Sequence, residues 1–175
     1  MKFDPVKGIV TALLGAYYLW YAFGDPLHNF ANWNIVDDVD LIIHEAGHFV
    51  FMFFGNFIHV LGGSLMQILI PIIFAGYFFW YRREYFSGSV ILFWVAQNII
   101  NVSVYMGDSV VQQLPLLGGD GVIHDWNYLL SHTGLLGFTD VLSRATYGVG
   151  VMLVIAAIVL CAKFSFKESK QAPIS

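Results

Sequence analysis

Five long apolar runs constrain the fold of this chain more than any other feature of its sequence. They lie near residues 6–23, 39–54, 64–81, 88–106 and 145–162. Each run approaches the roughly 20 apolar residues that a helix needs to cross a bilayer, and only 11 % of the 175 residues are charged. We therefore expect an all-α fold, a polytopic transmembrane helix bundle. In it, residues 1–175 make a single membrane-embedded domain of a multi-pass integral membrane protein.

The few basic residues bear on partners and on topology. The formal net charge is -4, and no basic patch could follow a phosphate backbone, so nucleic acid is not an expected partner. Positive charge occurs near the N-terminus, at Arg82 and Arg83, and at the C-terminal lysines. All three fall on one side of the membrane, as positive charges tend to, if the runs 39–54 and 64–81 make one net crossing. We therefore expect one apolar segment to be re-entrant.

The second apolar run contains the motif His44-Glu45-Ala46-Gly47-His48. Positions four apart lie on the same face of a helix, so His44 and His48 present two imidazoles to one point. Zinc accepts neutral imidazole nitrogen, and an adjacent carboxylate can take a proton from a zinc-activated water. The motif predicts Zn²⁺ as cofactor, His44 and His48 as its ligands and Glu45 as the general base. Ionisable groups at membrane depth are expensive to bury, which favours a functional reading.

The third metal ligand is expected in the polar region that connects the last two apolar runs, residues 107–143. Zinc in hydrolases usually has three protein ligands. His124 suits zinc by ligand type. Asp120 lies between glycines and could reach a metal, or could cap a helix that begins near Val122. Asp125 could bind the metal itself or orient an imidazole ligand.

Polar residues also occur inside the other apolar runs. Ser64 and Gln67 follow Gly62-Gly63, where the chain could dip into the membrane, and are candidates for binding a substrate backbone or for hydrogen bonding between helices. Asn101 is a third candidate for substrate binding and belongs to a polar stripe, which could line a water-filled site or hold helices together. The stripe consists of Gln97, Asn101, Tyr105 and Asp108, at spacings of four, four and three.

Two sequence segments together resemble the site-2 protease family of intramembrane zinc metalloproteases. They are the HEAGH motif in a membrane segment, followed by a Gly-Gly element, and the downstream segment Pro115-Leu116-Leu117-Gly118-Gly119-Asp120-Gly121. The resemblance implies His44 and His48 as zinc ligands, Glu45 as the base and Asp120 as the third ligand. It also implies Asn101 as a loose counterpart of the family's asparagine.

The sequence leaves three functions open. The first is an intramembrane zinc metalloprotease-like hydrolase, which cleaves a peptide bond of a membrane-protein or peptide substrate in or near the bilayer. The second is a zinc lipid amidase or related hydrolase that acts on membrane lipid. The third is a non-catalytic metal-bearing scaffold for membrane partners. Metal activation of water at Glu45 is common to the first two functions.

Overall fold

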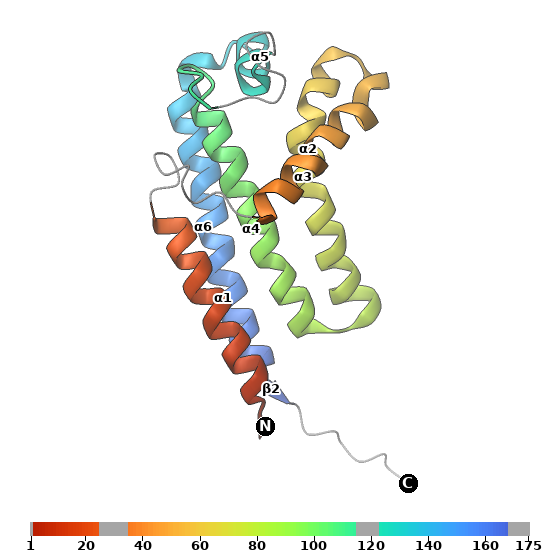
Figure 1. Ribbon diagram of the computed structural model, residues 1–175, viewed down its shortest axis with the longest axis vertical. Helices are drawn as coiled ribbons and strands as arrows, with labels where there is room; N and C mark the ends of the chain where they lie inside the picture. The colour runs from red at the N-terminus through yellow and green to blue at the C-terminus, as the bar shows by residue number, and fades with distance from the viewer. Residues whose placement is uncertain (1, 25–34, 115–122, 168–175) are drawn as a thin grey trace.

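The computed structural model describes residues 2–24, 35–114 and 123–167, and this part of the chain is almost entirely helical (Figure 1). The expectation of an all-α bundle is confirmed. The described part contains six α-helices and one short antiparallel pair of strands, β1 (Lys2–Phe3) and β2 (Phe166–Lys167). The helices are α1 (Pro5–Phe23), α2 (Ile35–Phe51), α3 (Asn56–Gly76), α4 (Tyr85–Gly107), α5 (Asp125–His132) and α6 (Thr139–Phe164).

Four helical segments of the described part are long and apolar enough to cross a membrane: Pro5–Phe23, Asn56–Arg82, Tyr85–Gly107 and Leu136–Phe164. The Asn56–Arg82 segment consists of α3 and a π-helical turn, Tyr77–Arg82, that continues it. Helix α2, which carries the HEAGH motif, has 17 residues and is not among the four. The five apolar runs of the sequence therefore correspond to four candidate spans and one shorter helix.

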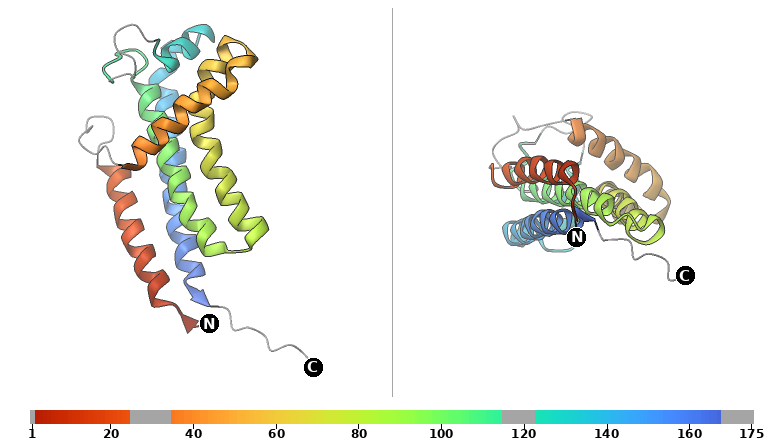
Figure 2. Two further views of the ribbon diagram at one scale, coloured as in Figure 1. Left: turned by 45° about the vertical axis from the view of Figure 1, so that its right-hand side comes forward. Right: turned by 90° about the horizontal axis from the view of Figure 1, so that it is seen from below.

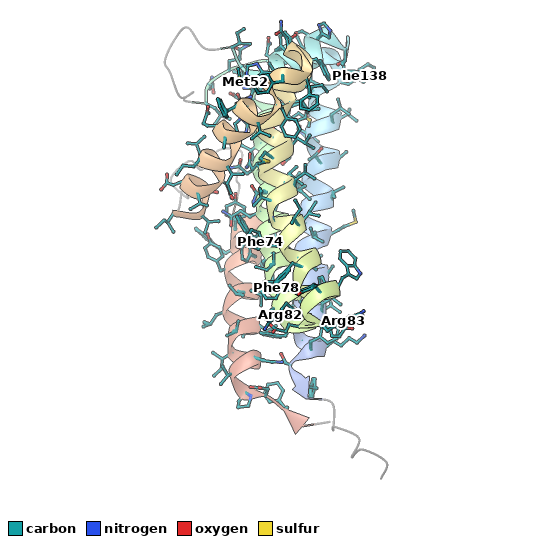
Figure 3. The ribbon with its side chains drawn as sticks, turned by 90° about the vertical axis from the view of Figure 1, so that its right-hand side faces the viewer. Met52, Phe74, Phe78, Arg82, Arg83 and Phe138 are labelled. Carbon is teal, nitrogen blue, oxygen red and sulfur yellow. The ribbon has the colours of Figure 1, made fainter. Side chains whose placement is uncertain are left out.

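The two ends of the bundle differ in what they carry. The N-terminus, β2 and the turn between α3 and α4 lie toward one end, whereas α5 and the connection between α2 and α3 lie at the other (Figures 1 and 2). Figure 3 places Arg82 and Arg83 far from Met52 and Phe138 along the long axis. Of the basic residues that the structure describes, Lys2 and Lys167, which are paired in the two strands, thus share one end of the bundle with Arg82 and Arg83, the arrangement that the sequence predicts if the runs 39–54 and 64–81 make one net crossing.

The apolar core lies where α1, α4 and α6 run side by side (Figure 2). Phe93 of α4 stacks on Tyr18 of α1, with ring centroids 4.9 Å apart. Ile100 of α4 and Val154 of α6 are fully buried in the same cluster. Helix α4 of this three-helix body faces the polar side of α2, the helix that carries the motif.

Helix α2 is polar on its buried face and mostly apolar on its exposed face. It buries Asp37, Asp40, His44 and Gly47, which recur at helical spacing. Its exposed residues are mostly apolar, namely Ile35, Val39, Ile42, Phe49 and Val50, with the carboxylates Asp38 and Glu45 among them. This is the reverse of a helix on the surface of a soluble protein, whose apolar stripe faces the core. An apolar exposed face matches a lipid environment, and the polar buried face requires partners inside the bundle.

Helices α2 and α3 approach each other closely where both have glycine. A Cβ at Gly47 would lie 2.3 Å from the carbonyl oxygen of Gly62, and a Cβ at Gly62 would lie 2.8 Å from the carbonyl oxygen of Gly47. The Gly62-Gly63 pair lies inside α3, which runs without a break from Asn56 to Gly76, and it packs where α3 crosses α2. Small residues at such crossings let two backbones come together.

Candidate metal site

His44, His48 and Asp125 form one cluster, in which one possible ligand atom from each residue lies within 4.8 Å of the others. The Nε2 atom of His44 is 2.9 Å from Asp125 Oδ2, and the Nε2 atom of His48 is 3.2 Å from the same oxygen. The two histidines lie one turn apart on α2, and Asp125 is the first residue of α5. The cluster thus joins residues 81 positions apart in the sequence.

Both imidazoles are oriented through their Nδ1 atoms. His48 Nδ1 lies 2.9 Å from the carbonyl oxygen of His59, which can only accept a hydrogen bond. His44 Nδ1 lies 3.1 Å from Gln67 Oε1, while the amide nitrogen of Gln67 donates to Asn101 Oδ1 at 2.9 Å. Both rings therefore carry their proton on Nδ1 when they are neutral, and this leaves the Nε2 lone pairs for a metal. Such outer hydrogen bonds fix ring orientation at histidine metal sites.

The donor set fits a divalent metal. In the neutral tautomers, two Nε2 lone pairs and a carboxylate oxygen point at one another, and electron pairs repel unless a cation or added protons lie between them. Two imidazoles and one carboxylate are the three protein ligands of many catalytic zinc sites, which keep a fourth position for water or substrate. His44 and Asp125 are buried, so the cluster lies inside the bundle rather than among solvated surface charges.

Asp125 is held in place by contacts from three helices. Its backbone N–H donates to the Tyr105 hydroxyl at 3.2 Å, and the adjacent Trp126 indole donates to Ser64 at 3.2 Å. Burial raises the pKa of Asp125, but in the absence of metal, protons on the Nε2 atoms of His44 and His48 donate hydrogen bonds to its carboxylate and outweigh burial, so the pKa of Asp125 lies below its ordinary value. Asp125 is therefore an anionic donor at neutral pH.

His124 is not part of the cluster that the structure brings together. It is the N-cap of α5, because its Nδ1 accepts from the backbone N–H of Asn127 at 3.3 Å. Its Nε2 then carries the proton and faces Asp108 Oδ2 at 3.4 Å. Burial lowers the pKa of His124, although the Asp108 carboxylate acts in the opposite direction. Of the two candidates for the third ligand that the structure describes, the geometry favours Asp125 over His124. Asp120 lies outside the described residues.

The three residues considered for substrate binding all bond to other side chains of the bundle. Gln67 and Asn101 form the relay that ends on His44, and Ser64 accepts from Trp126. The polar stripe of α4 faces the other helices, as Gln97 donates to Asp37 of α2 at 2.8 Å and Asp108 faces His124 of α5. These polar residues join helices, which is one of the two uses that the sequence leaves open.

Glu45 lies on the exposed side of α2, next to the cluster rather than within it. Its carboxylate is close enough to interact electrostatically with His48 and with Tyr105. The flanking residues Ile42 and Phe49 are exposed apolar side chains. A carboxylate in this place can meet a substrate that approaches from the outer face of α2.

Gly63 of α3 lies directly against the cluster. A Cβ at this position would be 2.5 Å from His44 Nε2 and 2.6 Å from His48 Nε2. Only a residue without a side chain leaves room for the two nitrogens to share a ligand. The Gly62-Gly63 pair is evident in the sequence, but the partner of Gly63 depends on how α3 packs on α2. The roles of Trp126 and of the His59 carbonyl had no signal in the sequence.

We expect Gly63→Ala to lose zinc, because the added methyl group displaces the two Nε2 atoms from their common point. The matched control is Gly148→Ala on α6, where an added Cβ meets nothing within 4 Å. Elemental analysis of both purified variants after zinc loading checks this. Full zinc content in Gly63→Ala would contradict the position assigned to the metal.

Comparisons with known proteins give no relative for this chain. No protein-family model matches it, and neither does any curated protein or solved structure.

Proposed function

We propose that this chain is a multi-pass integral membrane zinc hydrolase that cleaves a peptide bond within or near the bilayer. The observation that carries the proposal is the convergence of His44 Nε2, His48 Nε2 and the Asp125 carboxylate, with Glu45 beside them on α2. An HExxH motif on a helix is the pattern of a zinc hydrolase, and here the fold adds a third donor from a distant segment.

Placement in the membrane is supported by two features of the bundle. Four helical segments have the length and hydropathy to cross a bilayer. Helix α2 has too few residues for that criterion, yet it turns Ile42, Phe49 and Val50 outward and His44 inward. In water this helix would expose its apolar side chains at a cost of roughly 25 cal/mol per Å², whereas in lipid these side chains need no cover.

Different residues of the site have different roles in the proposed hydrolysis. Zinc, when bound, supplies a Lewis acid that polarises a carbonyl group and makes water more acidic. Glu45 takes the proton of the attacking water and passes it to the nitrogen of the leaving amine, as a general base and then a general acid. Gln67 and the His59 carbonyl hold the imidazoles in the tautomer that binds metal. Burial of the cluster limits access of bulk water to the donors.

A lipid amidase is the second candidate. Glu45 lies between the exposed apolar residues Ile42 and Phe49, and an acyl chain can lie along such a surface. In the described part of the chain, the only strand pair is β1 with β2, at the end of the bundle away from α5. A peptide substrate would therefore bind by contacts other than pairing with a strand edge near the cluster.

The experiment that tests the function compares two substrates in one membrane. Purified protein in phosphatidylcholine vesicles receives either single-span membrane peptides or an amide-linked acyl lipid, and mass spectrometry detects the products. We expect new peptide amino termini that disappear with a zinc chelator and return with added zinc. Fatty acid release without peptide cleavage would reject the peptidase function in favour of the lipid amidase function. If zinc-loaded protein forms neither product, the non-catalytic scaffold is the function that remains.

A further inference from the structure

A second polar cluster lies between α2 and α4, apart from the three metal-binding residues. Asp37 and Asp40 lie one turn apart on the buried face of α2, and Trp94, Gln97 and Asn98 face them from α4. Asp40 is 1 % exposed, and Gln97 and Asn98 are 0 % exposed. Asp40 precedes His44 by one turn of helix, but it shares none of the hydrogen bonds of the histidine cluster.

Asp40, Gln97 and Asn98 each form a hydrogen bond through one side-chain atom and have one further side-chain oxygen that forms none. Asp40 Oδ1 accepts from the Trp94 indole at 2.7 Å. The amide nitrogen of Gln97 donates to Asp37 at 2.8 Å, and that of Asn98 donates to the carbonyl oxygen of Trp94 at 3.0 Å. These bonds fix which end of each amide is oxygen. Asp40 Oδ2, Gln97 Oε1 and Asn98 Oδ1 have no hydrogen-bond partner among the described residues.

All three remaining atoms are electron-pair donors, so a cation or a hydrogen-bond donor would stabilise them. An unsatisfied buried acceptor costs about 1–3 kcal/mol, and an uncompensated buried carboxylate costs more. The charged and titratable groups that act on Asp40 from the packed helices are Asp37 of α2 and the tyrosines Tyr18 and Tyr21 of α1. In the described part of the chain, no Lys, Arg or His forms an ion pair with Asp40.

We propose that Asp40, Gln97 and Asn98 bind a sodium ion between α2 and α4. The donors are oxygen atoms only, which suits a hard cation rather than zinc. One carboxylate and two neutral amides supply a single negative charge, which matches a monovalent ion, whereas calcium sites in proteins take six to eight oxygen ligands, as a rule with several carboxylates. The ion would tie α2, and with it the HEAGH motif, to the core helix α4.

Thermal unfolding of the detergent-purified protein tests this site. Sodium chloride is compared with choline chloride at equal concentration. We expect sodium to raise Tm by about 3 °C or more, because a ligand that binds only the folded state stabilises it. Asp40→Asn removes the charge and should abolish the sodium increment. The matched control Asp38→Asn changes an exposed carboxylate on the same helix and should keep the increment.

His44→Ala separates this site from the histidine cluster, since it should lose zinc and keep the response to sodium. Equal Tm values in sodium and choline for the wild type would overturn the proposal. An unchanged sodium increment in Asp40→Asn would overturn it as well. Stabilisation of the wild type in choline on acidification, with no effect of sodium, would show that Asp40 binds a proton instead. If Asp40→Asn fails to fold, Asn98→Leu serves as the second variant and should also lose the increment.

Discussion

Replacing Glu45 by Gln is expected to lower hydrolysis by about 10²- to 10⁴-fold, the usual contribution of a general base, and to leave about one zinc per chain. The amide keeps the shape of the side chain but cannot take a proton from water. Glu45 is outside the group of three converging donors, so the metal should stay. The measurement is the rate of product formation in vesicles, together with elemental analysis of the same sample.

The matched control for this variant is Glu84→Gln. Glu84 is an exposed carboxylate at the α3–α4 turn, where it pairs with Arg82, and this turn lies at the end of the bundle away from α5. Its replacement should change neither rate nor zinc content. Full activity in Glu45→Gln would refute the mechanism. Loss of zinc in Glu45→Gln would instead make this carboxylate a ligand.

The second large effect is expected from Asp125→Ala, which removes the third donor. Its loss should weaken zinc binding by more than the about 10- to 100-fold that removal of an outer-shell partner costs. His124→Asn is the matched neighbour, because asparagine is a good N-cap and preserves the hydrogen bond that His124 makes to Asn127. This variant should keep its zinc. Competition with a chelator of known zinc affinity measures both variants.

The opposite result would reverse the assignment. Zinc binding that survives in Asp125→Ala and fails in His124→Asn would place the metal on the imidazole of His124. Weakening of both variants by the same factor would mean that α5 as a whole, rather than one carboxylate, supports the metal. Far-UV circular dichroism of each variant reports whether the helix content is preserved.

Local periodicity was sufficient to predict that His44 and His48 converge on one point and to predict the fold class. His44 and His48 are four residues apart, and this spacing alone places them on one face of a helix. Long apolar runs likewise predict helices because lipid and packed helices offer the backbone no other partners. Gln97, Asn101, Tyr105 and Asp108 were predicted to share one face of a helix, and each has a partner on another helix.

The third donor could not be predicted in the same way, because it depends on how α5 docks. His124 and Asp125 are neighbours in the sequence, but at the start of a helix they point in different directions. The N-cap position directs His124 back toward the helix and Asp108, while the first helical position directs Asp125 to the histidines. Docking through Tyr105 and Ser64 decides between them, and these contacts have no sequence pattern.

The number of spans differed from the number of apolar runs for a related reason. The run from residue 39 to 54 is apolar enough to suggest a span, but its helix begins at Ile35 and contains Asp37, Asp38 and Asp40. Asp37 and Asp40 are buried and accept hydrogen bonds from α4, and the helix has only 17 residues. Hydropathy reflects the apolar residues on the exposed side of α2, but it does not predict which residues of α4 bond to the polar residues on the buried side.

The proposed function requires that His44, His48 and Asp125 together hold one zinc ion. Elemental analysis with zinc X-ray absorption spectroscopy of the wild-type protein in detergent tests it most directly. We expect about one zinc per chain, bound by two imidazole nitrogens and carboxylate oxygen at about 2.0–2.2 Å. Absence of zinc after loading with the metal would contradict the claim. A spectrum with three imidazoles or with none would contradict the proposed ligands.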